Sequence, residues 1–476
     1  MFRGALFVRY STYFFGIFIT AFNIFLLTYF LDVNEFSVWG ISMSLIYVLS
    51  QLGQLTYVQY VEKYFPNISY EEMKNKLYRF IKTIFLFSPI WFLTLEFLKL
   101  IGYFQKFKIE NIENLFLMIV TLIILESSIE VVSKFMLASK NTMNFDISEL
   151  FILKILRAVS FYLLLINNYS IFHLLFVSVL IRGTFLIYIL FLNEKSIIKI
   201  IKNIFFANIF YENFQNFKYT LYAFLIKTFQ ISFLNLIFLI YTRNSISETI
   251  AAFSLGVIIV NNVRPIISSL SSLMTPSLSE RAKNKEIASE YLVKSSFLNT
   301  LIASFFILGI LVFVEFKGLY DMYFLEFDSY VYSIAILSVF ASTINPTYTP
   351  AFIFIKFSEK EANIFKFVIT NFILSLLAFL YLQTIGISRV ILIYIMFELL
   401  NLFGTNYLYK KNFENTSIFK FSKNFLLLVG FSFVDLFYTD LPLNRFVILS
   451  LIVFIYDFYN IYKLKDSYKQ FFKNLK

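Results

Sequence analysis

Long apolar stretches, separated by short polar segments, run along the whole chain of 476 residues. An α-helix needs about 20 mostly apolar residues to cross the hydrocarbon core of a bilayer. The pattern predicts about fourteen spans of this kind, near residues 10–30, 39–61, 80–103, 114–137, 148–166, 170–192, 217–241, 248–275, 295–314, 329–355, 364–385, 388–409, 424–439 and 444–463. Because the connections are short, we expect an all-α integral membrane protein without a soluble domain.

The composition agrees with this interpretation and excludes several kinds of site. Hydrophobic residues make up 59% of the chain and charged residues 15%, and the mean hydropathy is +0.74. Soluble domains carry nearer to 25% charged residues. The chain has no cysteine and a single histidine, His173. We therefore expect no disulfide, no cysteine-ligated or histidine-rich metal centre and no cofactor.

The net charge of +11 has two interpretations, a nucleic-acid partner or a membrane topology. Lys and Arg gather in the cytoplasmic connections of membrane proteins. With the N-terminus placed inside, 29 of the 41 Lys and Arg residues fall on the inner side, 7 on the outer side and 5 within spans. This alternation predicts cytoplasmic termini in the inner (cytoplasmic) membrane and argues against a nucleic-acid partner.

Two pairs of segments suggest that the chain is internally duplicated. The segment from Phe135 is similar to that from Phe352, and the segment near Phe22 is similar to that near Leu234, at offsets of about 212 to 217 residues. An even number of helices separates the partners, so the repeats are parallel, as in one class of transporters. We expect two pseudo-symmetric six-helix lobes, 1–210 and 211–410, and two C-terminal helices with a cytoplasmic tail in 411–476.

The first two spans, and the connection after the eighth, carry a resemblance to a known family. The residues concerned are Leu31, Glu35, Trp39, Gly40, Gly53, Pro276 and Ser277. In these positions the chain resembles the Wzx-type O-antigen and polysaccharide flippases of the multidrug/oligosaccharidyl-lipid/polysaccharide exporter superfamily. The resemblance implies translocation of an undecaprenyl-pyrophosphate-linked oligosaccharide to the outer leaflet. It also implies three kinds of partner: the lipid-linked glycan, membrane lipids and other polysaccharide-assembly proteins.

Charged residues inside the predicted spans are the candidate site, because each costs about 2.5–3.5 kcal/mol even on a lenient insertion scale. Arginine holds phosphate oxygens in a bidentate fork, and lysine acts as a point charge. We therefore expect a pyrophosphate site facing a cavity between the lobes, formed by Arg264, Lys227, Arg182 and Arg157. An alternative for Arg157 and for Lys154 is that they reach the cytoplasmic side, or pair with Glu149 or Glu130. For Arg182, Lys227 and Arg264 the alternative is pairing with Glu126, Glu130 or Glu398 away from any cavity, which would argue against a pyrophosphate site.

Three acidic residues at mid-depth are candidates for coupling transport to protons or sodium ions. They are Glu126, Glu130 and Glu398. Glu126 and Glu130 share a helix face with Lys134, because the three are spaced by four residues. The alternative is a structural role, in which Glu126 pairs with Arg182 or Arg157.

Prolines inside predicted spans mark candidate hinges, since proline removes a helical hydrogen bond. They are Pro265, Pro346 and Pro350, and the alternative is a simple packing kink. Gln51 and Gln54 share a face of the second span, where they would contact sugar hydroxyls or only link helices.

Two other functions remain open at this stage. One is a small-molecule or multidrug exporter of the same superfamily, for which we would expect an acidic rather than a cationic cavity. The other is an integral membrane enzyme of envelope assembly. The chain contains no phosphate-binding P-loop and no acidic cluster in a large loop, so we expect a transporter rather than an enzyme.

Overall fold

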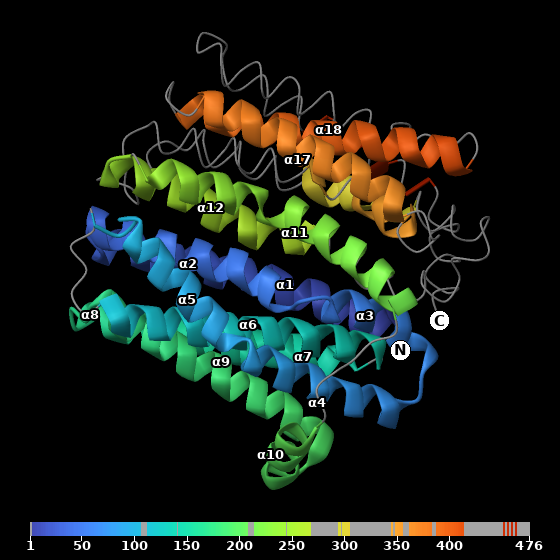
Figure 1. Ribbon diagram of the computed structural model, residues 1–476, viewed down its shortest axis with the longest axis horizontal. Coiled ribbons are helices and arrows are strands. Elements are labelled where there is room, and N and C mark those ends of the chain that lie inside the picture. The colour runs from blue at the N-terminus through green and yellow to red at the C-terminus, as the bar shows by residue number, and fades with distance from the viewer. Residues whose placement is uncertain are drawn as a thin grey trace. The chain divides into compact units, whose positions relative to one another are not determined.

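Helices and the short breaks between them make up all the described part of the chain (Figure 1). The computed structural model describes residues 2–105, 112–139, 141–207, 214–243, 245–267, 361–382 and 387–413, with short pieces in 294–355 and 451–463. Seven helices there are long and apolar enough to cross a membrane, namely Phe7–Phe30, Val33–Gly53, Tyr70–Leu100, Ile112–Ala138, Ile171–Glu194, Tyr219–Thr242 and Ala362–Leu382. The predicted spans 295–314, 329–355, 424–439 and 444–463 lie largely outside the described residues.

The chain divides into two compact units, which we describe separately. The first, Phe7–Ser254, contains α1 (Phe2–Phe30, from Phe7 on), α2 (Val33–Gly53), α3 (Tyr57–Tyr64), α4 (Tyr70–Leu86), α5 (Ser88–Leu100), α6 (Ile112–Ala138), α7 (Thr142–Ser148), the π-helix η2 (Glu149–Leu156), α8 (Arg157–Ile166), α9 (Ile171–Glu194), α10 (Ile197–Phe206), α11 (Phe214–Thr242) and the start of α12 (Ser247–Ile267). The second, Met1–Leu6 with Leu255–Lys476, contains the first residues of α1, the rest of α12, α17 (Glu361–Leu382) and α18 (Ile387–Phe413).

Helix α6 lies at the centre of the first unit. It packs against α2, α3, α4, α5 and α9, and its apolar side chains are largely buried, including Phe116, Ile119 and Phe135 at 0% exposure. An apolar helix that is buried on most of its surface needs no solvent-facing polar stripe. The two acidic residues of α6 at mid-length are therefore exceptions that need partners.

Two departures from the predicted spans arise inside helical segments. The predicted span 39–61 is interrupted after α2, where Leu55 has a φ of +51° and the helix restarts as α3. The predicted span 148–166 begins as a π-helix and continues as α8. Apolar character continues through both places, so hydropathy alone does not reveal them.

Contacts within the first unit bring together the connections that the charge pattern places on one side. Lys134 pairs with Glu62 at 3.0 Å, and Lys74 pairs with Glu194 at 3.0 Å. At the other end of the helices, the Tyr103 hydroxyl lies 2.7 Å from that of Thr242. The predicted alternation of connections therefore matches the grouping of helix ends in this unit.

Close approach between helices explains the glycine in the aromatic–glycine pair of α2. The N-terminus of α2 is capped by Asp32, which accepts a hydrogen bond from the Glu35 amide at 2.7 Å. One turn further on, a Cβ atom built on Gly40 would lie 1.9 Å from the Ser254 Oγ and 2.4 Å from its Cβ. Only glycine allows this approach between α2 and α12.

We predict that Gly40→Ala destabilises the protein, because the new methyl group overlaps a side chain that is 1% exposed. Overpacking of this kind costs about 1–3 kcal/mol. A matched control is Gly183→Ala in α9, since a Cβ atom there meets nothing within 4 Å. Thermal stability in detergent, measured by fluorescence-detected gel filtration, should fall for the first variant and hold for the second. Adding Ser254→Gly should rescue Gly40→Ala, and a Gly40→Ala variant as stable as the wild type would contradict the contact.

Candidate functional site

The charged residues expected at mid-depth form ion pairs between different helices. Glu126 and Glu130 lie on successive turns near the middle of α6, where their side chains are 30% and 36% exposed. Arg182 lies midway along α9, and Lys227 midway along α11. Each carboxylate thus meets a cation from a neighbouring helix, and the first unit carries two such pairs.

The first pair joins α6 to α9. The Arg182 Nε donates to Glu126 Oε1, and the Arg182 side chain is 8% exposed. Pairing of Glu126 with Arg182 was one of two expected structural arrangements, and it is confirmed. An ion pair held between two apolar helices costs desolvation on both sides, and it is weak evidence for stability.

The second pair joins α6 to α11 and includes a glutamine from the end of α2. The Lys227 ammonium donates to Gln54 Oε1 at 3.0 Å and to Glu130 Oε1 at 3.3 Å. Gln54 is 2% exposed, and its hydrogen bond to Lys227 links the end of α2 to α11. Linking helices is one of the two roles expected for it. Gln51, the residue that shares its face, has a buried Oε1 without a hydrogen-bond partner among the described residues.

Arg157 is the candidate cation that forms no ion pair with a carboxylate among the described residues. It is the first residue of α8, directly after the π-helix, and its buried Nε has no hydrogen-bond partner among the described residues. Glu126 and Arg182 are close enough to act on it electrostatically. Glu149, which pairs with Lys154, acts on it as well. Among the described residues, three cations thus share two carboxylates, and Arg157 is the one without an ion pair.

Lys154, three residues before Arg157, has a carboxylate partner. Its ammonium lies 3.4 Å from Glu149 Oε1, across one turn of the π-helix. This is one of the alternatives expected for it. The Lys154 side chain lies along α1 at Gly16, where a Cβ atom would come within 2.7 Å of the Lys154 Nζ.

A bidentate ion pair that the sequence did not indicate lies near the first turns of α1. The Arg9 Nε and Nη2 atoms donate to the two oxygens of Asp146, each at 2.9 Å, and both side chains are almost fully buried. Burial raises the pKa of the Asp146 carboxyl above its usual range, and the Arg9 guanidinium opposes that rise. The two residues are 137 positions apart, so no local pattern could have revealed the pair.

The second unit contains the third pair, between α12 and α18. The Arg264 Nη2 lies 3.4 Å from Glu398 Oε1, and the Glu398 side chain is 0% exposed. The other carboxylate oxygen accepts from the Tyr348 hydroxyl at 2.7 Å and from Asn345 Nδ2 at 3.4 Å. The carboxylate is thus surrounded by one cation and two neutral donors.

Two further amides lie within one turn of Glu398. The Asn371 Nδ2 of α17 donates to Asn401 Oδ1 of α18 at 2.8 Å and to the Phe397 carbonyl at 3.0 Å. Asn371 is 3% exposed and Asn401 is 0% exposed. Polar side chains from four segments therefore meet at one place inside the second unit, and three of these side chains, those of Arg264, Asn345 and Tyr348, surround Glu398 directly.

Two of the three hinge candidates lie among the described residues. Pro265 lies within α12, and Pro350 lies in a helical piece that is described from Tyr348 on. Pro346 lies outside the described residues. The hinge role stays a prediction for all three.

A metal centre was not expected, and no group of three or more His, Asp or Glu side chains that could hold a metal ion occurs among the described residues. The chemistry available at the candidate site is that of exchangeable ion pairs. Among the described residues, Arg182 and Lys227 pair with Glu126 and Glu130 in the first unit, and Arg264 pairs with Glu398 in the second.

Comparisons with known proteins bear on the fold. No family model matches the sequence, and no curated protein sequence is similar to it. Among solved structures, the chain is similar to one described as "protein A", with a TM-score of 0.60 and 15% identity over 86% of this chain and 95% of that one. It is also similar to the lipid II flippase MurJ in an inward closed conformation, with a TM-score of 0.59 and 13% identity over 98% and 99% of the two chains. A eukaryotic MATE transporter, AtDTX14, gives a TM-score of 0.49 at 12% identity over 88% and 95%.

The likeness to the flippase covers nearly the whole of both chains, so it is not limited to a few spans. At this level of identity the likeness concerns the fold and not the substrate. The expected fold class is thereby confirmed: the chain is an all-α, multi-pass integral membrane protein folded like the lipid II flippase MurJ.

Proposed function

We propose that the chain is a flippase for an undecaprenyl-pyrophosphate-linked oligosaccharide, which it moves across the cytoplasmic membrane for the assembly of a surface polysaccharide. The observation that carries the proposal is that Arg157 has no ion pair among the described residues, although it lies beside the pair of Arg182 and Glu126. A surplus positive charge in an apolar setting is costly, and an anionic headgroup would offset that cost. The likeness in fold to a lipid II flippase is compatible with a lipid-linked substrate for this chain.

In this proposal the ion pairs are the resting partners of the cations. A phosphate oxygen accepts the same hydrogen bonds from arginine or lysine as a carboxylate does, so a pyrophosphate can replace Glu126, Glu130 or Glu398. Each displaced carboxylate would then need another positive charge. A proton or a sodium ion meets that need, which makes the three glutamates the points where an ion gradient would couple to transport. The chain's own role is binding and exchange, and no bond in the substrate is broken.

The proposed substrate distinguishes this function from that of a multidrug exporter. A carrier of cationic drugs needs acidic groups in excess at its binding site, whereas each of the three carboxylates here has a basic partner and Arg157 has no ion pair among the described residues. The proposed orientation follows from the charge pattern, with the basic connections and both termini in the cytoplasm.

We predict that Arg157→Gln weakens the binding of undecaprenyl pyrophosphate by about 10-fold to 100-fold, the value of one hydrogen bond to a charged group. Thermal stability should change little, because no ion pair of Arg157 among the described residues is broken. Binding is measured on the purified protein in nanodiscs, with undecaprenol as the uncharged control ligand. Lys410→Gln, at an exposed position in the last turn of α18, is the matched charge control.

Arg157→Lys should retain part of the affinity, since the charge remains and the fork is lost. Equal binding of undecaprenyl pyrophosphate and undecaprenol by the wild-type protein would refute the anionic headgroup as the recognised group. Unchanged affinity in Arg157→Gln would remove this residue from the site.

A further inference from the structure

Helix α10 is a short amphipathic helix that the proposed function does not use. Lys195 ends α9 in the left-handed conformation, with a φ of +54°, and redirects the chain. Ser196 then caps the new helix, since its Oγ accepts from the Lys199 amide at 3.4 Å. Ten residues follow as Ile197–Phe206, a length of about 15 Å, which is too short to span a bilayer.

Contacts at both ends hold α10 in place. Glu194, at the end of α9, accepts from the Tyr78 hydroxyl at 2.9 Å and from Asn203 Nδ2 at 3.2 Å, and it pairs with Lys74. At the other end, the Lys82 ammonium donates to the carbonyls of Phe205 and Ala207, both at 2.7 Å. These bonds fix α10 to the end of α4 that the charge pattern places in the cytoplasm.

The outer face of α10 is strongly apolar and exposed. Ile197, Ile201 and Phe205 follow one another at intervals of four residues and are 52%, 58% and 75% exposed, and Ile198 beside them is 79% exposed. Ile200, on the opposite face, is 5% exposed and packs inward. Lys199 and Lys202 are exposed and flank the apolar stripe.

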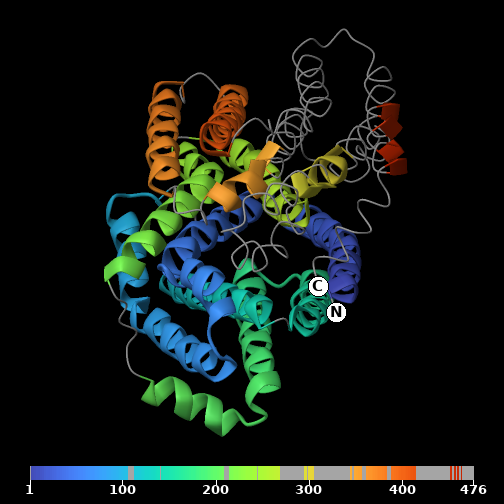
Figure 2. The ribbon, with the colours of Figure 1, turned by 90° about the vertical axis from the view of Figure 1, so that its right-hand side faces the viewer.

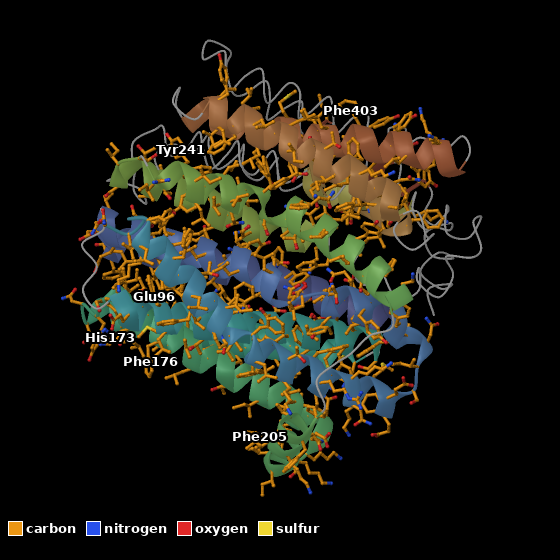
Figure 3. All side chains as sticks on the ribbon, viewed as in Figure 1. Glu96, His173, Phe176, Phe205, Tyr241 and Phe403 are labelled. Atoms are coloured by element: carbon orange, nitrogen blue, oxygen red, sulfur yellow. The ribbon has the colours of Figure 1, made fainter. Side chains whose placement is uncertain are left out.

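The direction of α10 also differs from that of the spanning helices. Helices α1 and α6 lie lengthwise in Figure 1, where α10 is foreshortened, and in the turned view of Figure 2 α10 lies lengthwise. In Figure 3, His173 marks the start of α9, and Phe205 lies in α10, beyond the other end of α9. Helix α10 therefore runs across the direction of the spans at one end of them.

We propose that α10 lies in the headgroup region of the cytoplasmic leaflet and binds anionic phospholipid. The apolar stripe continues the exposed apolar surface of α9, where Ile187, Tyr188 and Phe191 are 40–52% exposed, into the interface. A helix with one apolar face flanked by lysines is suited to that depth, since its apolar side enters the acyl boundary and its cations meet anionic headgroups. The proposal is independent of the transported substrate.

Environment-sensitive labelling tests the proposal, because the chain has no cysteine and a single one can be introduced. Ile201→Cys and Phe205→Cys are labelled with a nitrobenzoxadiazole probe in the full-length protein, reconstituted with and without phosphatidylglycerol. We expect quenching by nitroxide-labelled lipid, protection from aqueous iodide, and deeper probe positions when phosphatidylglycerol is present.

The double variant Lys199→Gln/Lys202→Gln, in the labelled background, should weaken phosphatidylglycerol binding by roughly 25-fold, at about fivefold for each lysine near an anionic surface. The matched control is Lys410→Gln/Lys411→Gln in the last turn of α18, which should leave the probe signals unchanged. Access of iodide to both probes, or probe depths that do not depend on phosphatidylglycerol, would overturn the proposal. A third outcome would also overturn the proposal: the two probes are accessible to iodide in reconstituted vesicles but protected in native membranes. That result would favour a protein partner for α10.

Discussion

The variant Arg264→Ala is expected to abolish glycan export and also to lower the stability of the second unit. The reason for the second effect is Glu398, whose side chain is 0% exposed and whose only charged neighbour within ion-pair distance among the described residues is Arg264. Removing one partner of a buried pair costs about 3–5 kcal/mol, because the remaining charge is left uncompensated. Loss of export in this variant alone would therefore not separate a substrate role from a folding defect.

The double variant Arg264→Gln/Glu398→Gln separates a substrate role from a folding defect. It leaves no charge at this place, and the new amides can hydrogen-bond to Tyr348 and Asn345, which now donate to the carboxylate. We expect thermal stability near that of the wild type, with export reduced at least about 100-fold, the value of about 2.7 kcal/mol. Export is measured as surface glycan in cells that depend on this chain, and stability by gel filtration after heating.

Two other outcomes are informative for Arg264. Arg264→Lys should keep part of the export, since a point charge remains and the bidentate fork is lost. Normal export by the uncharged double variant would show that the pair is structural and would exclude Arg264 from the pyrophosphate site.

The spans were predictable from the sequence because apolar length is a sufficient signal for a membrane helix. The predicted ranges 114–137 and 170–192 correspond to α6 and α9 within a few residues. Helix α10 was missed for the same reason, since ten residues fall below the length that such a search detects. Its sequence, with isoleucine and phenylalanine at helical spacing and Ser196 before them, contains the signal that a search for amphipathic helices would have found.

The charged residues were predictable as a set, but not as pairs. A charge in an apolar stretch stands out in the sequence, so Glu126, Arg182 and Lys227 could be named. Which helices pack side by side decides the partner, and that depends on contacts between positions 56 to 97 residues apart. For this reason the sequence named Glu126, Glu130 and Glu398 only as a set of possible partners for Arg182, Lys227 and Arg264, without assigning Glu130 to Lys227.

Exchanging the charges of one pair should distinguish a binding role from a linking role. In Lys227→Glu/Glu130→Lys the ion pair between α6 and α11 is kept at the same depth, with the cation moved from α11 to α6. If Lys227 only holds the two helices together, the exchange should preserve both stability and export. We expect instead that stability is preserved while export falls about 10-fold or more, because a hydrogen bond to a charged headgroup is worth about 1.5–3 kcal/mol and depends on position.

A second ion pair on the same helix supplies the control. Lys134 and Glu62 lie 3.0 Å apart at the end of α6 that is predicted to be cytoplasmic, outside the candidate site. The exchange Lys134→Glu/Glu62→Lys also reverses an ion pair of α6, although it changes the charge of α6 in the opposite direction, and export should remain near the wild-type level. The single variant Lys227→Glu places two carboxylates side by side and should be less stable than the exchanged pair, which shows that the ion pair has formed again. Wild-type export by Lys227→Glu/Glu130→Lys would show that Lys227 contributes its charge to packing alone, and the headgroup would then have to be held by Arg157, Arg182 and Arg264 without it.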